Sequence, residues 1–268
     1  MTCWLAAPDR FLMSCCVRNT SSRILVTRPT GQAQHLCNLI EAAGHECIHL
    51  PALEILEPAD SYRLEAVTDT LEDYDLAVFV SVNAVRMGME YILNRRDWPE
   101  ETLIATVGAS SAAALLPYGL SVDLLPEHQY NSEALLALDE LQDMSGQCVV
   151  IFRGNGGRDV LRDTLLARGA DVDYVEVYQR KCPTVDARRM QALLQPGHLD
   201  CITITSNEAL QNLFAMAGAE GQRLLLQIPL VVIGARQATL AQQLGFVHAP
   251  LVATNASDEA IVAAIQQR

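Results

Sequence analysis

The chain contains a strand–turn–helix–strand unit twice, and this repeat constrains the fold more than any other feature. In the first copy a strand at Ile24–Arg28 leads to a helix at Ala33–Ala43 and a strand at Glu46–Leu50. In the second copy a strand at Val149–Phe152 enters the turn RGNGG, and a helix leads to a strand at Val172–Val177. Units of this length build parallel sheets, whose loops bind ligands at the carboxyl ends of the strands.

The register of the repeat continues along the chain. Arg28 recurs as Arg153 and Gly44 recurs as Gly169, in both cases 125 positions later. Further matches follow in order, at an offset of 125 or 126: Asp75–Ser81 with Asp200–Ser206, Gly108 with Gly234, Gly119 with Gly245, and Glu133 with Glu259. We therefore interpret the chain as an internal duplication of one α/β module, giving two flavodoxin-like, doubly wound parallel-sheet domains.

Ten strands are expected, five in each module, including short strands at Val122–Leu125 and Val247–Ala249. If each sheet needs five strands, the first unit of the chain completes the C-terminal module. The first domain is then 23–50 plus 183–268, and the second is 58–175. Two linker strands, 51–57 and 176–182, run side by side, and 1–22 is a disordered extension. A plain division into an N-terminal and a C-terminal half is the alternative.

Composition excludes several classes of protein. The net charge of −13 argues against nucleic acid and anionic membranes as partners. No apolar run approaches the roughly 18 residues of a membrane helix. The first 22 residues lack a basic start and carry Asp9 and Arg10 within their apolar pattern, so a signal peptide is not expected.

The cysteines and histidines give no sign of a metal site or a disulfide framework. None of the eight cysteines forms a C-x-x-C pair, and Cys47, Cys148 and Cys201 fall in apolar strands. Reduced thiols and a cytoplasmic location are expected. The run RGNGG is only part of a dinucleotide-binding fingerprint, and no acidic residue ends the following strand, so no nucleotide cofactor is predicted.

Five short motifs together resemble the uroporphyrinogen-III synthase family, from Arg23 to the C-terminus, in order and with matching spacing. They are Thr27-Arg28-Pro29, Ser81-x-Asn83-Ala84-Val85, Gly108, Arg153–Arg158 and Val177-Tyr178-Gln179-Arg180. The resemblance implies a monomeric lyase without a cofactor. Such an enzyme closes the linear tetrapyrrole hydroxymethylbilane into a ring, with loss of water and inversion of the last pyrrole. The preceding bilane-forming enzyme would be a candidate to hand over this substrate.

The substrate that the resemblance implies is a polycarboxylate, and helix N-termini bind anions through free N–H groups. The strand-to-helix turns of this chain are then candidate binding sites, although each alone is equally an ordinary capped turn. The candidate residues in these turns are Ser81, Asn83, Gly108, Ser110, Asn131, Ser132, Gly154, Asn155, Ser206, Asn207 and Gly234. Ser132 is expected to cap its helix.

Three arginines lie where predicted strands end: Arg28, Arg153 and Arg236. A guanidinium there can bind a carboxylate in bidentate fashion, or it can form a local ion pair. Arg236 lies two residues after Gly234, at a position where members of the family usually have a hydroxyl residue, so the chain departs from the family there. Ser110 occupies the matching position after Gly108 in the first copy. Arg158 and Arg162 are expected to be solvated.

Tyr178 is the candidate catalytic residue. It follows the predicted strand Val172–Val177, where the chain is expected to leave its domain. A phenol stays protonated at neutral pH, so it can donate a proton to a departing hydroxyl group. The resemblance gives the family's matching tyrosine the same role. The alternative is a hinge tyrosine that only packs its ring.

Two other functions fit a pair of α/β modules. A solute-binding protein would need an export signal, which is not found, and a sugar-nucleotide transferase would need a diphosphate or acidic metal motif. The sequence therefore favours the tetrapyrrole-cyclising enzyme.

Overall fold

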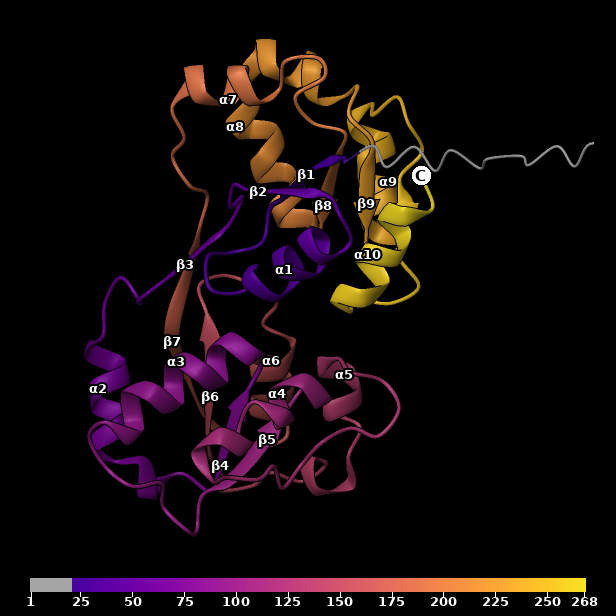
Figure 1. Ribbon diagram of the computed structural model, residues 1–268. Coiled ribbons are helices and arrows are strands. Elements are labelled where there is room, and N and C mark those ends of the chain that lie inside the picture. Colours follow the sequence, from indigo (N-terminus) through magenta and orange to yellow (C-terminus); the bar gives the residue numbers. More distant parts are fainter. Residues whose placement is uncertain (1–20) are drawn as a thin grey trace, which may run out of the picture. The chain divides into compact units, whose positions relative to one another are not determined.

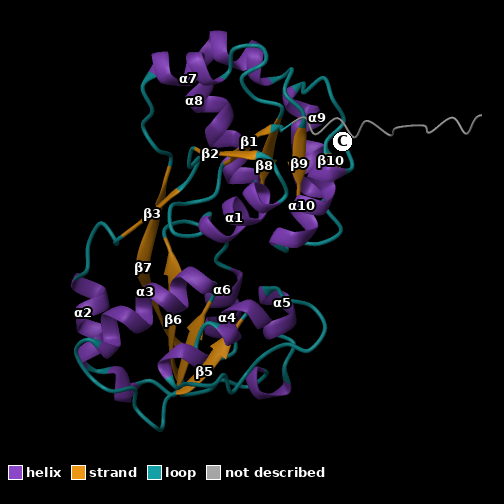
Figure 2. Cartoon of the chain, in the orientation of Figure 1, coloured by secondary structure: helices purple, strands orange, loops and turns teal. Residues whose placement is uncertain are grey.

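A computed structural model describes residues 21–268, and contacts divide this part of the chain into two units. Unit 1 consists of residues 21–50 and Val185–Arg268, and unit 2 is Pro51–Thr184. Each unit holds a five-stranded sheet with helices on both faces (Figure 1; Figure 2). The α/β class with two mainly parallel sheets is confirmed. The extension predicted at 1–22 lies outside the described residues except Ser21 and Ser22, and the Ser22 carbonyl accepts a hydrogen bond from Glu46 N at 2.9 Å.

The sheet of unit 1 has the strand order β10-β9-β8-β1-β2, and every neighbouring pair is parallel. Numbered within the unit, this is the flavodoxin-like order 2-1-3-4-5. The strands are β1 (Arg23–Val26), β2 (Glu46–His49), β8 (Cys201–Ile204), β9 (Leu230–Val232) and β10 (Leu251–Val252). The last strand does not lie at Val247–Ala249 as predicted. The N–H groups of Phe246 and Val247 bond instead to Ala241 O and Leu226 O, and this pairing holds the chain in a turn after the helix.

The helices of unit 1 cover the two faces of this sheet. On one face, α1 (Gln34–Ala42) and α10 (Asp258–Gln266) pack their apolar side chains on β1 and its neighbours. Elsewhere α7 (Ala187–Leu193) contacts α8 (Asn207–Leu225), which packs on β8, and α9 (Ala235–Leu244) packs on β9. Non-helical backbone at Gly218, with φ 62° and ψ 174°, breaks α8 next to the predicted end at Ala217.

The sheet of unit 2 has the order β3-β7-β6-β4-β5, in which only β3 is antiparallel to its neighbour. The strands are β3 (Glu54–Leu56), β4 (Leu76–Phe79), β5 (Leu103–Thr106), β6 (Cys148–Gly154) and β7 (Asp171–Lys181). The strand predicted at Val122–Leu125 is reduced to one bridge, between Leu124 and Ala105. The reason is local: the Asp123 carboxylate accepts the Ile104 N–H at 2.7 Å, which a paired strand would otherwise use.

Two cores lie on opposite faces of this sheet. One contains Phe79 and Phe152, whose rings stack 4.8 Å apart, under α2 (Tyr62–Asp69) and α3 (Val82–Leu93). The other lies under α5 (Ser132–Leu135) and α6 (Val160–Ala167). Two predicted helices are shorter than expected: α4 (Ala109–Ala113) and α5 stop before Leu116 and Leu141. After α4, Pro117 lies in a 3-10 turn. After α5, the Arg168 guanidinium donates hydrogen bonds to the carbonyls of Leu136 and Leu141.

The strand register of one sheet recurs in the other. Ile24 pairs with Cys201 in unit 1, and Val149 pairs with Leu76 in unit 2. Val149 lies 125 positions after Ile24, and Cys201 lies 125 positions after Leu76. The same holds for Arg23 with Glu46 and Cys148 with Asp171. The carboxyl ends of β1 and β6 therefore occupy equivalent places in their sheets.

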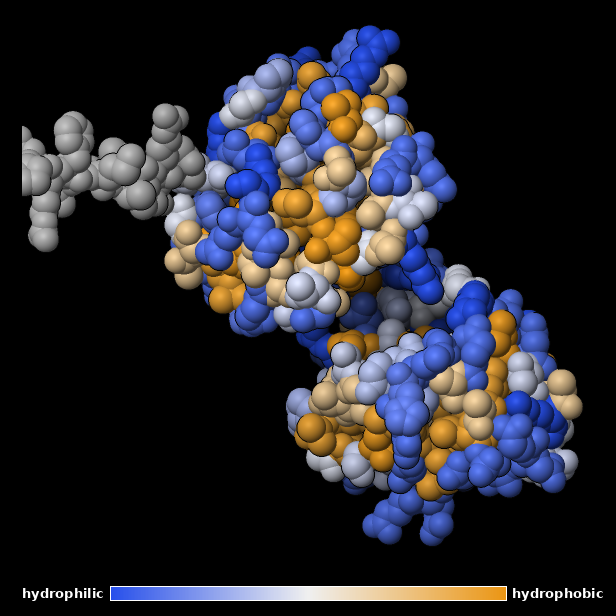
Figure 3. Space-filling view, turned by 90° about the vertical axis from the view of Figure 1, so that its right-hand side faces the viewer, coloured by the Kyte–Doolittle hydropathy of each residue, from blue (hydrophilic) through white to orange (hydrophobic). Residues whose placement is uncertain are grey.

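On the face seen in Figure 3, both units show hydrophilic residues interspersed with apolar patches. Among residues 21–268, no helix combines the length and the apolar character needed to cross a membrane.

Candidate functional site

A pocket of about 220 Å³ lies at the carboxyl ends of β4, β6 and β7 in unit 2. Three arginines line it, Arg153, Arg158 and Arg180, and its lining contains no carboxylate. Two of these arginines are ion-paired with carboxylates outside the lining, Arg153 with Asp159 and Arg158 with Glu133. The predicted site residues that it brings together are Ser81, Ser132, Arg153, Gly154 and Tyr178.

The sequence predicted that Tyr178 follows its strand, but in the structure it lies within β7. The strand continues to Lys181 because Gln179–Lys181 pairs with β3, a partner distant in sequence. The ring is 5% exposed, and its hydroxyl oxygen lies 3.1 Å from Ser81 Oγ. Ser81 Oγ also accepts the Ala84 N–H at 3.1 Å and so caps α3, as predicted. The Tyr178 phenol is thus held at a helix N-terminus.

Gly154 allows the phenol ring to lie against the end of β6. A Cβ at this position would lie 2.5 Å from Cε2 and Cζ of Tyr178, closer than any carbon–carbon contact allows. Only glycine therefore leaves the ring in place.

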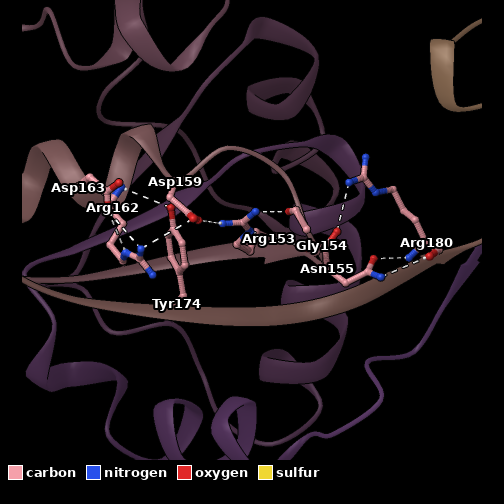
Figure 4. Close-up of polar contacts among 9 residues, drawn as sticks. Arg153, Gly154, Asn155, Asp159, Arg162, Asp163, Tyr174 and Arg180 are labelled. Carbon is pink, nitrogen blue, oxygen red and sulfur yellow. Dashed lines mark hydrogen bonds and ion pairs between the residues drawn. The ribbon is translucent and has the colours of Figure 1, made fainter.

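Arg153 is buried, with 8% exposure, and its guanidinium is engaged with neighbouring groups of its own turn (Figure 4). Nη1 bonds to Asp159 Oδ1 at 3.1 Å, Nη2 donates to the Gly156 carbonyl, and the guanidinium carbon lies 4.6 Å from the centre of the Tyr174 ring. Of the two alternatives for Arg153, this geometry corresponds to the local ion pair. The turn also uses positive φ at Gly156 (68°) and Gly157 (103°), which favours glycine.

Arg158 and Arg162, which we expected to be solvated, are exposed but paired. Arg158 forms a two-pronged contact with the Glu133 carboxylate, in which Nη2 and Oε2 are 3.1 Å apart. This hydrogen bond lowers the pKa of Glu133 and raises the pKa of Arg158. Arg162 bonds to Asp163 and lies over the Tyr174 ring. The Arg158–Glu133 pair joins α5 to the loop before α6.

Asn155 contacts the backbone of β7 on both of its polar side-chain atoms. Oδ1 accepts the Arg180 N–H at 2.6 Å, and Nδ2 donates to the Arg180 carbonyl at 3.4 Å. Arg180 and Tyr174 line the pocket although neither was among the predicted site residues. Arg180 follows Tyr178 by two residues, so strand periodicity was a signal for it; the position of Tyr174 depends on long-range packing.

The remaining predicted residues of unit 2 do not line this pocket. Asn131, and not Ser132, caps α5, since its Oδ1 accepts the Ala134 N–H at 2.8 Å. An extended backbone at Asn131 suits the cap position, whereas Ser132 is already helical. Gly108 precedes α4, Ser110 is its second residue, and Asn83 lies in the first turn of α3.

The predicted residues of unit 1 lie at the carboxyl ends of β1, β8 and β9. Arg28 Nη1 contacts Asp258 Oδ1 at 2.5 Å, and His35 contacts the same carboxylate at 2.7 Å. Ser206 Oγ accepts the Ala209 N–H at 3.0 Å and caps α8, as predicted, with Asn207 as the first helical residue. Gly234 precedes α9, and Arg236 is exposed in its first turn.

Within residues 21–268, no group of three or more histidine, cysteine or acidic side chains could hold a metal ion. The cysteines of this part of the chain are free thiols. Burial raises the pKa of Cys201 to about 11, so this thiol stays protonated near neutral pH.

The fold and the pocket define a class: an α/β protein of two units with mainly parallel sheets, with an arginine-lined pocket at the carboxyl ends of the strands of unit 2. Residues 34–263 match the model of a family described as uroporphyrinogen-III synthase HemD. The uroporphyrinogen-III synthase of Escherichia coli K12 is 33% identical over 245 residues, covering 91% of this chain and 99% of that protein. The chain therefore belongs to the uroporphyrinogen-III synthase family.

Two solved structures share the fold. The uroporphyrinogen-III synthase of Thermus thermophilus, as a mutant, has a TM-score of 0.61 at 18% identity and covers 92% of this chain and 97% of its own. The enzyme of Helicobacter pylori has a TM-score of 0.61 at 15% identity, with coverage of 92% and 100%.

Proposed function

We propose that this protein is a uroporphyrinogen-III synthase, a hydro-lyase that converts hydroxymethylbilane into uroporphyrinogen III. Water is lost and the last pyrrole ring is inverted in the product. Membership of the family supports the reaction. The observation that supports a particular active site is the arginine-lined pocket in which the Tyr178 hydroxyl contacts the Ser81 hydroxyl.

The pocket suits the carboxylates of such a substrate. Arg158 and Arg180 line it together with Gly154, Gly156 and Gly157. A substrate carboxylate at Arg158 takes the place of the Glu133 carboxylate that is paired with it. The N-terminus of α3 adds N–H groups that need no basic side chain. Within unit 1, the N-termini of α8 and α9 offer N–H groups of the same kind. The shorter α4 and α5 carry smaller dipoles, so Gly108, Ser110, Asn131 and Ser132 are weaker candidates than Ser81, Ser206 and Gly234.

Tyr178 acts as the general acid in this proposal. In the proposed mechanism the Ser81 hydroxyl is the donor of its 3.1 Å contact with the phenol oxygen, so that the phenol proton is free for the departing hydroxyl group of the bilane. The pyrrole nitrogen supplies the electron pair that expels this group, and the group leaves as water. Negative charge on the phenol oxygen is stabilised by the N–H groups that begin α3. General acid catalysis of this kind typically contributes 10²–10⁴-fold.

We further propose that residues 23–50 with 183–268 and residues 58–175 are the two domains, with 51–57 and 176–182 as linker strands. The antiparallel ladder of β3 with β7 supports a paired linker. A monomer in the cytoplasm that needs no cofactor is part of the same proposal, as is direct handover of bilane from the enzyme that makes it. The free thiols of the described residues support the reducing compartment.

A product assay tests the activity. Purified protein receives freshly generated hydroxymethylbilane, and the porphyrin isomers are separated after oxidation. Bilane without enzyme closes to the type I isomer, so type III is the expected product and type I alone at the spontaneous rate contradicts the proposal.

Tyr178→Phe tests the acid in the same assay and should lower kcat by about 10²-fold or more. Tyr118→Phe is the matched control, because the Tyr118 hydroxyl makes only a long contact of 3.5 Å with the Arg86 carbonyl. Equal rates for the two variants would remove Tyr178 from the mechanism.

A further inference from the structure

The pairing of β6 with β7 changes where the two strands reach the pocket. From Cys148 with Asp171 to Arg153 with Glu176 the partners are in constant register, but Gly154 pairs with Tyr178. Val177 is therefore an extra residue on β7, a bulge in a parallel pair. Bulges of this kind re-aim the side chain that follows, and here that side chain is the Tyr178 phenol.

Beyond the bulge, β6 turns away at the glycines of the RGNGG loop, and β7 loses its backbone partner on that edge, while β3 pairs with its other edge. Asn155 replaces that partner. Its backbone N–H donates to the Tyr178 carbonyl at 3.1 Å. Its side-chain amide then pairs with both backbone polar groups of Arg180, at 2.6 and 3.4 Å, as the next residue of a strand would (Figure 4).

The contacts of Asn155 leave its side chain turned toward β7. The Arg180 Nη2 group also donates to the Asn155 carbonyl, at 3.2 Å, so the arginine is joined to this residue through both its backbone and its side chain. Asn155 does not line the pocket, whereas Tyr178 and Arg180 do.

We propose that Asn155 is a positioning residue for the cyclisation: its amide fixes β7 at Arg180 and thereby holds the Tyr178 phenol and the Arg180 guanidinium at the pocket. This assignment rests on the proposed function and replaces the direct contact with substrate that the sequence suggested for Asn155.

The test compares Asn155→Ala with Asn155→Asp, because the aspartate keeps the oxygen that accepts the Arg180 N–H. Positioning predicts that the alanine variant loses at least about 10-fold in kcat, because the Tyr178 phenol is displaced, and that KM rises with the displaced Arg180 guanidinium. It predicts that the aspartate variant recovers most of this loss. A direct contact with substrate predicts the reverse order, since an added carboxylate repels a polycarboxylate. Asn155→Ala should also cost less in a Tyr178→Phe background than in the wild type.

Asn38→Ala is the matched control, because the Asn38 amide is exposed and its oxygen accepts a hydrogen bond from the Gln34 side chain within α1, and neither residue lines the pocket. A raised KM at unchanged kcat in Asn155→Ala, or a rate equal to that of Asn38→Ala, overturns the proposal.

Hydrogen exchange separates this inference from the activity itself. The Arg180 amide should exchange roughly 10-fold faster in Asn155→Ala and stay protected in Asn155→Asp, since the oxygen that accepts the Arg180 N–H is removed in the first variant only. If the wild type makes no type III isomer, the proposed function fails, and the exchange rates still decide whether Asn155 fixes β7. Unchanged protection of Arg180 in the alanine variant overturns the positioning role.

Discussion

Replacing Gly154 with alanine should displace the Tyr178 ring and lower activity far more than stability. The backbone of Gly154 is not in the left-handed region, so alanine causes no strain of its own there. The added Cβ, however, would lie 2.5 Å from two ring carbons. Carbon contacts require about 3.5 Å, so the ring or the strand must move by about 1 Å.

This movement has two consequences of different size. Overpacking of a buried site typically costs about 1–3 kcal/mol, which leaves most molecules folded in a protein of ordinary stability. A movement of about 1 Å also breaks the 3.1 Å contact between the phenol and Ser81. Misplacement of a reacting group by such a distance can lower the rate by about 10²-fold.

The assay is formation of the type III isomer, run beside thermal unfolding, with Gly88→Ala as control. A Cβ at Gly88 would lie 3.1 Å from Phe79 in the same unit, a milder contact that does not involve the Tyr178 ring. Gly88→Ala should keep kcat close to the wild-type value. The reasoning fails if Gly154→Ala is fully active, or if it lowers kcat as much in a Tyr178→Phe background as in the wild type.

Three further predictions concern the core, the thiols and Arg28. Phe79→Ala should lower the free energy of unfolding by about 3–5 kcal/mol in denaturant titration, because the ring is fully buried in the core of unit 2. Cys201 should resist alkylation at pH 8 while the exposed Cys182 reacts, which peptide mass spectrometry can follow. Since the folded pKa of Cys201 is raised to about 11, its contribution to stability is complete below pH 8.5 and is lost as the pH rises through 11. Asp258→Asn should lower KM if Arg28 binds a substrate carboxylate, because the guanidinium loses its ion pair; an unchanged KM with lower stability would make Arg28 structural.

The parts of the fold that sequence predicted are those decided by local chemistry. Ser81 and Ser206 were placed as caps because a hydroxyl residue stood between an apolar strand and a helical pattern, and both accept the expected N–H. Gly218 and Gly245 end helical segments near the predicted places. The repeat also predicted the parallel strands of both sheets, apart from the one at Val122–Leu125, but it did not predict that β3 joins the sheet of unit 2 as an edge strand.

The parts that were missed depend on partners distant in sequence. The extent of β7 past Tyr178 is set by β3 and by Asn155, and neither partner is visible in the local pattern. Whether Arg153 faces a ligand or its own turn depended on Asp159 and the Tyr174 ring, which only the folded loop brings to it. The candidate site was therefore predicted as a sheet edge, but not in its contacts.

The equivalence of the two sheets gives a matched pair of variants, Ser81→Ala and Ser206→Ala. The two serines are 125 positions apart, have nearly the same extended backbone, and accept N–H groups at 3.1 and 3.0 Å. Loss of either cap should cost about 1 kcal/mol of stability. Only Ser81 also contacts a phenol, so only Ser81→Ala should lower kcat, whereas Ser206→Ala should change KM alone.

This difference follows from the strands next to each cap. In unit 2 the bulge and the β3 ladder extend β7 to Lys181, and this extension brings Tyr178 to Ser81. In unit 1 the equivalent strand, β2, ends at His49, and the position 125 residues before Tyr178 is occupied by Leu53. Two equivalent sheet edges thus offer similar N–H groups to an anion, but a proton donor is present at one of them. Equal losses of kcat in Ser81→Ala and Ser206→Ala would contradict this division, because the cap would then matter in both units for the same reason.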